Sequence, residues 1–196
     1  YQAQVLTTGQ VFALTSDQLL AMETQDFASL STAAIQALAT ATVAVLSSAD
    51  VIALTTAQAQ ALATQQAYAL TTSQIESLET RDLVAVTTNA IAALSSDQIV
   101  ALTTTQVSNL STINVAALSS SQIVYLETQD LAALSTANLR NLSSVQVTSL
   151  LSVQIVALTT AQAASLASNQ VQALTTDQTS ALQTDDLRAL STATLR

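Results

Sequence analysis

A leucine recurs every eight residues along the chain. The series runs from Leu6 to Leu190 and defines 24 octads, in which Met22 and Val86 are the two replacements. If this apolar residue is numbered position 0, position 5 is Val, Ile, Leu or Phe in 20 octads and position 7 is mostly Ala. A fixed apolar period of this kind predicts a repeat protein whose core is formed by the rows at positions 0 and 5.

The polar positions follow the same period. Position 2 is Ser or Thr in all 24 octads, position 1 is Ser or Thr in 16, and position 4 is Gln in 13 and Asp in five. The consensus is L-[ST]-[ST]-x-Q-[VIL]-x-A, and no linker or charge block interrupts it. We therefore expect residues 1–196 to be a single continuous array of 24 octads, with partial repeats at both ends, that is part of a longer array or polymer.

Each octad carries the signals of a short helix. In residues 14–19, Thr15 and Gln18 form a capping box, in which the hydroxyl accepts from a backbone N–H of the first turn and the Gln side chain accepts from the cap N–H. Leu14 and Leu19 then hold the two positions of a hydrophobic staple. Because Ser or Thr is invariant at position 2, the N-cap is expected at position 1 or position 2.

These signals predict an all-α solenoid of very short capped helices, one per eight-residue repeat. A single long helix is excluded because eight residues at about 100° each would wind the Leu row around its surface. Helices of about six residues are unstable alone, so stacking must supply their stability. A β-solenoid is the alternative, since positions 3, 5 and 7 alternate as in a strand, but Ala and Gln favour helix.

Composition removes most chemical activities. The chain has no His, Cys, Trp or Pro and a single Gly, so imidazole and thiolate metal sites and the usual general bases and nucleophiles are missing. We expect a protein that is not an enzyme and has no catalytic, cofactor-binding or metal site. The formal net charge of −9, with four cationic residues, disfavours nucleic acid. No uninterrupted apolar run of about 18 residues is present, which argues against membrane insertion.

Four octads carry extra carboxylates. Residues 23–26, 79–82 and 127–130 have the sequence E-T-x-D, and residues 183–186 are similar, at spacings of seven, six and seven octads. The favoured interpretation is a larger duplication whose carboxylates are solvated near helix N-termini, where the helix dipole stabilises them. The alternatives are an acidic stripe set by the superhelical phase and a row of Ca²⁺ sites made by paired carboxylates.

Other residue types are explained without a site. The recurring Thr pairs suggest an ice-binding ladder, but helix capping explains them and also predicts the Gln at position 4. No octad position is common to four of the aromatic residues, and three arginines at position 6 are expected to face solvent. These two sets are Phe12, Phe27, Tyr68 and Tyr125, and Arg140, Arg188 and Arg196.

Two resemblances follow from these motifs. Residues 94–101, LSSDQIVA, resemble the opening helix of the repeats in TAL-effector DNA-binding proteins, but the 34-residue period, the base-reading loop and the basic charge are absent. The whole array is similar to the octapeptide repeat arrays of large bacterial exported, adhesin-like proteins. That resemblance implies an extracellular or cell-surface repeat region. It transfers no haem ligand, because His and Cys are absent and Met22 and the tyrosines have no supporting motif.

The expected function is therefore structural. We expect a rod, stalk or filament segment at the bacterial cell surface or outside the cell, which associates end to end with neighbouring repeats or with other copies. The first alternative is an adhesion module in which a solenoid face binds a protein or a glycan through the irregular positions 3 and 6. Ice binding is the second alternative.

Overall fold

The computed structural model describes residues 3–190, which contain 23 α-helices, one 3-10 helix and no β-strand. The all-α solenoid is thus confirmed for these residues, and the β-solenoid alternative is wrong. The elements are η1 (Ala3–Val5), α1 (Thr8–Phe12), α2 (Ser16–Leu20), α3 (Thr24–Ala28), α4 (Thr32–Ala37), α5 (Thr40–Val43), α6 (Ser48–Ile52), α7 (Thr56–Ala61), α8 (Thr64–Ala69), α9 (Thr72–Ser77), α10 (Thr80–Ala85), α11 (Thr88–Ala93), α12 (Ser96–Val100), α13 (Thr104–Asn109), α14 (Thr112–Ala117), α15 (Ser120–Ile123), α16 (Thr128–Ala133), α17 (Thr136–Asn141), α18 (Ser144–Ser149), α19 (Ser152–Val156), α20 (Thr160–Ser165), α21 (Ser168–Ala173), α22 (Thr176–Ala181) and α23 (Thr184–Ala189).

Every α-helix begins at position 2 of its octad, so position 1 is the N-cap. Thr159 is a representative cap: its backbone is extended, with φ −74° and ψ 154°, and its hydroxyl accepts from the backbone N–H of Gln162 at 3.2 Å. The Gln162 side chain in turn accepts from the Thr159 N–H at 2.8 Å, which completes the capping box. The predicted box is confirmed, and it settles the N-cap at position 1.

Three octads have Ala at the N-cap, and their helices begin without a side-chain cap. One of them, Ala63, precedes a Gln66 that already accepts from the Ala63 N–H at 2.9 Å. Ala63→Thr should therefore complete the box and stabilise the chain by about 0.5–2 kcal/mol, the usual difference between Thr and Ala at this position. Urea unfolding measures the change. Ala57→Ser, at an exposed position within a neighbouring helix, serves as control, and an equal effect there would contradict the capping explanation.

Most helices end at the apolar residue that opens the next octad, and the others end one or two residues earlier, as α12 does at Ala101. Leu166 has an extended backbone, with φ −58° and ψ 134°, and its N–H donates to the Ala163 carbonyl at 3.2 Å. No described residue has a positive φ, so these connections do not need the left-handed conformation that favours Gly. This explains how a chain with a single Gly, Gly9, connects so many helices.

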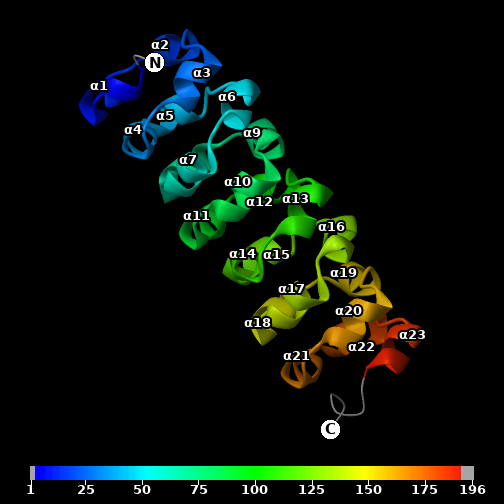
Figure 1. Ribbon diagram of the computed structural model, residues 1–196. Coiled ribbons are helices and arrows are strands. Elements are labelled where there is room, and N and C mark those ends of the chain that lie inside the picture. The colour runs from blue at the N-terminus through cyan, green and yellow to red at the C-terminus, as the bar shows by residue number, and fades with distance from the viewer. Residues whose placement is uncertain (1–2, 191–196) are drawn as a thin grey trace. The chain divides into compact units, whose positions relative to one another are not determined.

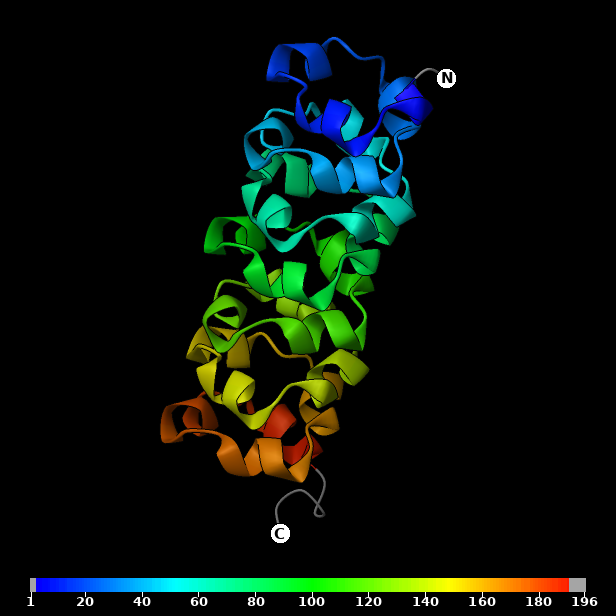
Figure 2. The same ribbon diagram turned by 90° about the vertical axis from the view of Figure 1, so that its left-hand side faces the viewer.

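The described chain forms two compact units, residues 3–102 and 103–190. In each unit, helices three apart in the chain are stacked; α4 lies beside α7, and α7 beside α10 (Figure 1). We call one such turn of the chain a coil. Side-chain hydrogen bonds between coils join residues 25 to 31 apart, so a coil holds slightly more than three octads. Figure 2 shows the same succession of short helices and extended connections from the side.

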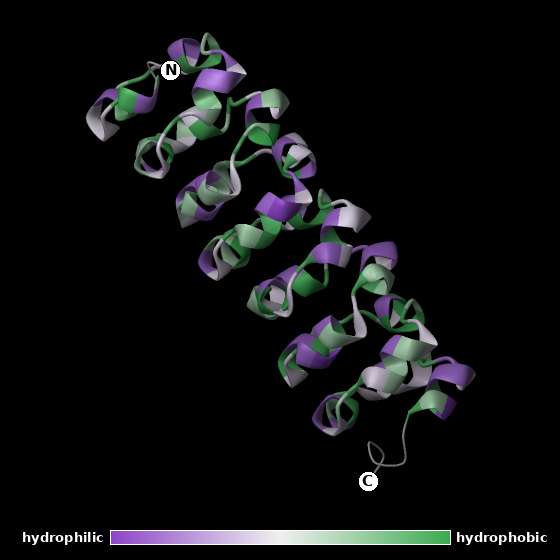
Figure 3. Cartoon of the chain, viewed as in Figure 1, coloured by the Kyte–Doolittle hydropathy of each residue, from purple (hydrophilic) through white to green (hydrophobic). Residues whose placement is uncertain are grey.

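The core consists of the predicted rows and one more. Residues at positions 0 and 5 are buried in nearly every coil, and Ala at position 7 is half-buried. From α4 onward position 4, which most often carries Gln, Asp or Asn, is also buried, although the sequence did not predict this. Each short helix thus presents both apolar and polar residues along its length (Figure 3).

The remaining sequence expectations divide between core and surface. Phe27 is a fully buried core residue, whereas Phe12, Tyr68 and Tyr125 are exposed. Arg140 and Arg188 are exposed at position 6, as predicted. Arg196, the third arginine at position 6, lies outside the described residues. Among the described residues, no helix has the length and apolar character needed to cross a membrane.

Candidate functional site: the buried amides at position 4

The Gln at position 4 joins its own helix to the preceding coil. In α20, the Gln162 side-chain oxygen accepts from the N-cap, and its Nε2 donates to the carbonyl oxygens of Leu131, Ala132 and Leu134 at 2.9, 3.2 and 2.8 Å. Only 2% of Gln162 is exposed. The two polar atoms of the Gln162 amide therefore have different roles. The oxygen accepts from the N-cap of its own helix, and the nitrogen donates to the C-terminal end of a helix in the preceding coil.

The same arrangement recurs through both units. In each case Nε2 lies within 3.5 Å of the carbonyl oxygens of the residues 31, 30 and 28 positions earlier. Carbonyl groups at a helix C-terminus have few partners within their own helix. The first of the three also accepts from the N–H three residues on, as Leu131 does from Leu134 at 3.2 Å, and the amide adds a donor for it and for the other two. The residues with all three contacts are Gln58, Gln66, Gln98, Gln146, Gln154, Gln162, Gln170 and Gln178.

The sequence analysis predicted the capping half of this arrangement and missed the other half. A capping box accepts Glu or Gln at the third helical residue. No octad has Glu at position 4, whereas 13 have Gln. That preference for an amide over a carboxylate is the signal that a donor is required there, and it could have indicated the contact between coils.

In three of the four acidic octads an aspartate occupies the same buried position. Asp82, Asp130 and Asp186 are at most 2% exposed. The hydroxyls of Thr56 and Thr104 donate to Asp82 and Asp130, each at 2.6 Å, across the gap between coils. The interpretation of these carboxylates as solvated is therefore wrong, and so is a surface acidic stripe built from them, because each side chain points into the stack.

The glutamate side chains of the acidic octads do not cap their helices. Glu23, Glu79 and Glu127 are N-caps without a side-chain cap hydrogen bond. Glu79 instead forms an ion pair with Arg81 at 2.7 Å, and Glu127 accepts from Gln129 at 2.7 Å. Within residues 3–190, no three acidic, His or Cys side chains come together as a metal-binding group.

The Asp130 carboxyl is predicted to make stability depend on pH. Burial raises its pKa above the ordinary value of 3.8; the hydrogen bond from Thr104 opposes this, and the Glu127 carboxylate adds to it. The folded chain therefore takes up this proton at a higher pH than the unfolded chain does. The Asp130 contribution thus favours folding increasingly as the pH falls from neutral through the folded pKa toward the ordinary value.

Asp130→Asn tests this expectation. The variant should be more stable than the parent at pH 7, and its advantage should shrink as the pH falls toward about 4. Urea unfolding across this range measures both effects. Asp177→Asn, which removes a carboxylate at an exposed position of the same unit, should give no such advantage. A constant difference between Asp130→Asn and the parent at every pH would contradict the titration.

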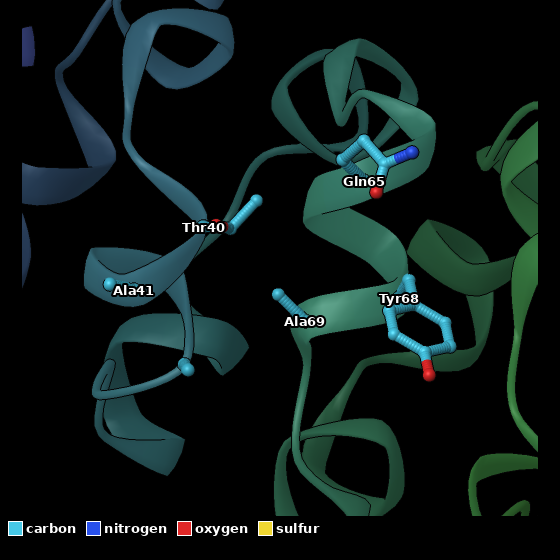
Figure 4. Close-up of a pocket in the computed structure, with 6 residues that line it drawn as sticks. Thr40, Ala41, Gln65, Tyr68 and Ala69 are labelled. Carbon is cyan, nitrogen blue, oxygen red and sulfur yellow. The ribbon is translucent and has the colours of Figure 1, made fainter.

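The surface of the first unit has shallow hollows around one aromatic ring. Tyr68 on α8 is 60% exposed. One hollow lies between α5 and α8 and is lined by Thr40, Gln65 and small alanines (Figure 4). A second lies between α8 and α11 and is lined by Thr64 and Ala93. Tyr68 lines both hollows, so its exposed ring is flanked by recessed surface on two sides.

Comparison with known families assigns the array. The model of the ALTTAQ repeat matches residues 19–56, 75–112 and 123–160, together more than half of the chain. The chain belongs to the ALTTAQ repeat family. The letters of the ALTTAQ repeat occur unchanged at residues 53–58 and 157–162, where the final Gln is the buried position-4 amide. No curated protein matches the chain.

The three ALTTAQ repeat matches are in register with the acidic octads. Glu23, Glu79 and Glu127 each lie four residues after the start of a match. The matched segments therefore repeat at the same spacing as the E-T-x-D sequence, and the Asp of that sequence is buried or half-buried in each of them. This supports a higher-order repeat above the octad.

Proposed function

We propose that the chain is a non-enzymatic structural segment of a rod, stalk or filament, located at a bacterial cell surface or outside the cell. The observation that carries this proposal is the row of buried position-4 amides. Their hydrogen-bonding capacity is used within the chain, to hold one coil against the previous one.

Contacts of this kind favour a structural role because each one is made with the neighbouring coil. The stability of such an array is a sum over repeats and their interfaces, so repeats can be added to the array without new kinds of contact. The same contacts would serve when one segment continues into further repeats or meets another copy end to end. The proposed location rests on the resemblance to exported octapeptide arrays.

Surface labelling tests the location and the role together. Antibodies raised against the purified chain should label intact bacteria that carry the gene, and electron microscopy should show the label displaced from the envelope. Deleting three octads within the array should shorten that displacement. Labelling that appears only after permeabilisation would overturn the proposal. So would a displacement that does not change with the number of octads.

A second candidate is a binding module, favoured by the surroundings of Tyr68. An exposed ring beside recessed amide and hydroxyl groups suits a glycan, which needs an apolar face and hydrogen-bonding partners. Retention of the purified chain on a glycan array would support this function if Tyr68→Ala abolished it. Tyr125→Ala is the control, because Tyr125 is also an exposed tyrosine. Equal retention by the two variants would reject a Tyr68 site.

A further inference from the structure

Asp82 places a carboxylate where most octads have an amide donor. In most octads that carry Gln, three backbone carbonyl groups of the preceding coil lie opposite position 4. The equivalent groups for Asp82 lie at and just beyond the C-terminal end of α6. They belong to the residues 31, 30 and 28 positions before Asp82, which are Val51, Ile52 and Leu54. In the equivalent octads, three such carbonyl oxygens converge on one nitrogen, as at Gln98, where the distances are 2.9, 3.2 and 2.6 Å.

The Asp82 side chain reaches into this region and leaves one oxygen unpaired. Its Oδ1 accepts from the Thr56 hydroxyl at 2.6 Å, on the helix that directly follows Leu54. Its Oδ2 is buried without a hydrogen-bond partner, and Asp82 is 0% exposed. A side chain of this length spans the distance, since Asn138 at the same position donates to the Leu110 carbonyl, 28 residues earlier, at 3.0 Å.

Asn and Asp have opposite consequences at this position. The Asn138 amide donates a hydrogen bond to the carbonyl oxygen. The Asp82 carboxylate can only accept, so it places another acceptor oxygen beside the carbonyl oxygens. Oxygens that crowd together without a proton between them are the arrangement that a hard cation stabilises. The C-terminal end of α6 adds the negative end of a short helix dipole.

We propose that the Asp82 carboxylate binds a Ca²⁺ ion together with the three carbonyl groups that occupy the equivalent places to those bound by Gln98. All the ligands are oxygens, in the mixture of carboxylate and backbone carbonyl that Ca²⁺ accepts. Glu79, in the same octad, occupies the position from which Gln183 in its own octad reaches the carbonyl 27 residues earlier at 2.9 Å. With one buried carboxylate the affinity falls in the range of about 10⁻⁴–10⁻³ M, typical of extracellular calcium modules.

Arg81 is the cation already present near the site. Its Nη2 pairs with Glu79 at 2.7 Å, and its Nε lies 3.6 Å from Asp82 Oδ1. The Arg81 side chain is 68% exposed, so it neutralises the outer part of the acidic pair. The unpaired atom is the other oxygen, Oδ2, which leaves the buried side of Asp82 for the metal.

Asp186 is a natural comparison. It is also buried and has an unpartnered Oδ2. Its octad has Gln183 in place of the glutamate, and the Gln183 amide already donates to the Val156 carbonyl at 2.9 Å. One of the three opposing carbonyls is therefore occupied by a donor, and we expect the Ca²⁺ response to come from Asp82.

Thermal unfolding of the purified chain at pH 7.5 tests the site. Saturating Ca²⁺ should raise the unfolding midpoint, on the order of 3–6 °C when free Ca²⁺ is about tenfold above Kd. Sodium chloride at equal ionic strength should not. Asp82→Asn should fold without Ca²⁺, because its amide can donate as that of Asn138 does, and should lose the response. Asp97→Asn, an exposed carboxylate of the same unit, and Asp186→Asn should keep it.

Three results would overturn the proposal. One is a parent chain whose midpoint does not respond to Ca²⁺. Another is a response that persists in Asp82→Asn. The third is a response lost equally in Asp97→Asn, which would mean general screening of the negative charge. None of these results bears on the proposed location of the chain, because the site can exist wherever the protein acts.

Discussion

Replacing Gln162 by Leu is expected to destabilise the chain by about 2–5 kcal/mol. The substitution removes the acceptor for the Thr159 N–H and the donor for three carbonyl oxygens, which leaves buried backbone groups unpaired. Chemical denaturation followed by circular dichroism measures the loss. Gln162→Glu separates the two halves, because Glu can still accept from the cap but cannot donate to the carbonyls.

Gln172→Leu is the matched control for this experiment. Gln172 is exposed on the next helix, α21, and the same change there should alter stability by about 0.5 kcal/mol or less. If Gln162→Glu were as stable as the parent, the stabilisation by Gln162 would come from its hydrogen bond to the N-cap, and its contact with the preceding coil would contribute little. Equal effects of Leu at both positions would contradict the role of burial.

Truncating a core leucine is expected to have an effect of similar size. Leu139 is 0% exposed at position 5, so Leu139→Ala should cost about 2–5 kcal/mol through lost apolar contacts and the cavity left behind. Urea unfolding measures the change. Val156→Ala, in which the parent side chain is 45% exposed, should cost much less. A similar loss at the two positions would show that position 5 is not the core row.

The period of the sequence predicted the helices because their signals are local. The Leu row, the cap at position 1 and the apolar residue at position 5 all lie within one octad, as the Thr159 capping box shows. The role of position 4 was missed because capping already explained Gln162. Its second partner lies 28 to 31 residues away, and no local pattern reveals how many octads make a coil.

The acidic octads were misread for the same reason. An Asp such as Asp82 near a helix N-terminus is normally exposed and stabilised by the dipole, so its local sequence suggests a solvated side chain. Burial comes from the neighbouring coil, whose Thr56 hydroxyl donates to it. That hydroxyl also gives one reason for Ser or Thr at position 2, since Thr56 and Thr104 both reach an Asp in the next coil.

The position-4 amide also determines how the array would respond to a pulling force. Its contacts with the preceding coil lie at one place in each octad, so a stretched chain would release them one group at a time. One octad contains eight residues, which span about 26–29 Å when fully extended. A single molecule held at its two ends would therefore lengthen in steps of about that size. Each released segment is expected to rebind the carbonyl groups still held in the coil beside it, so the extension should be reversible when the force is removed.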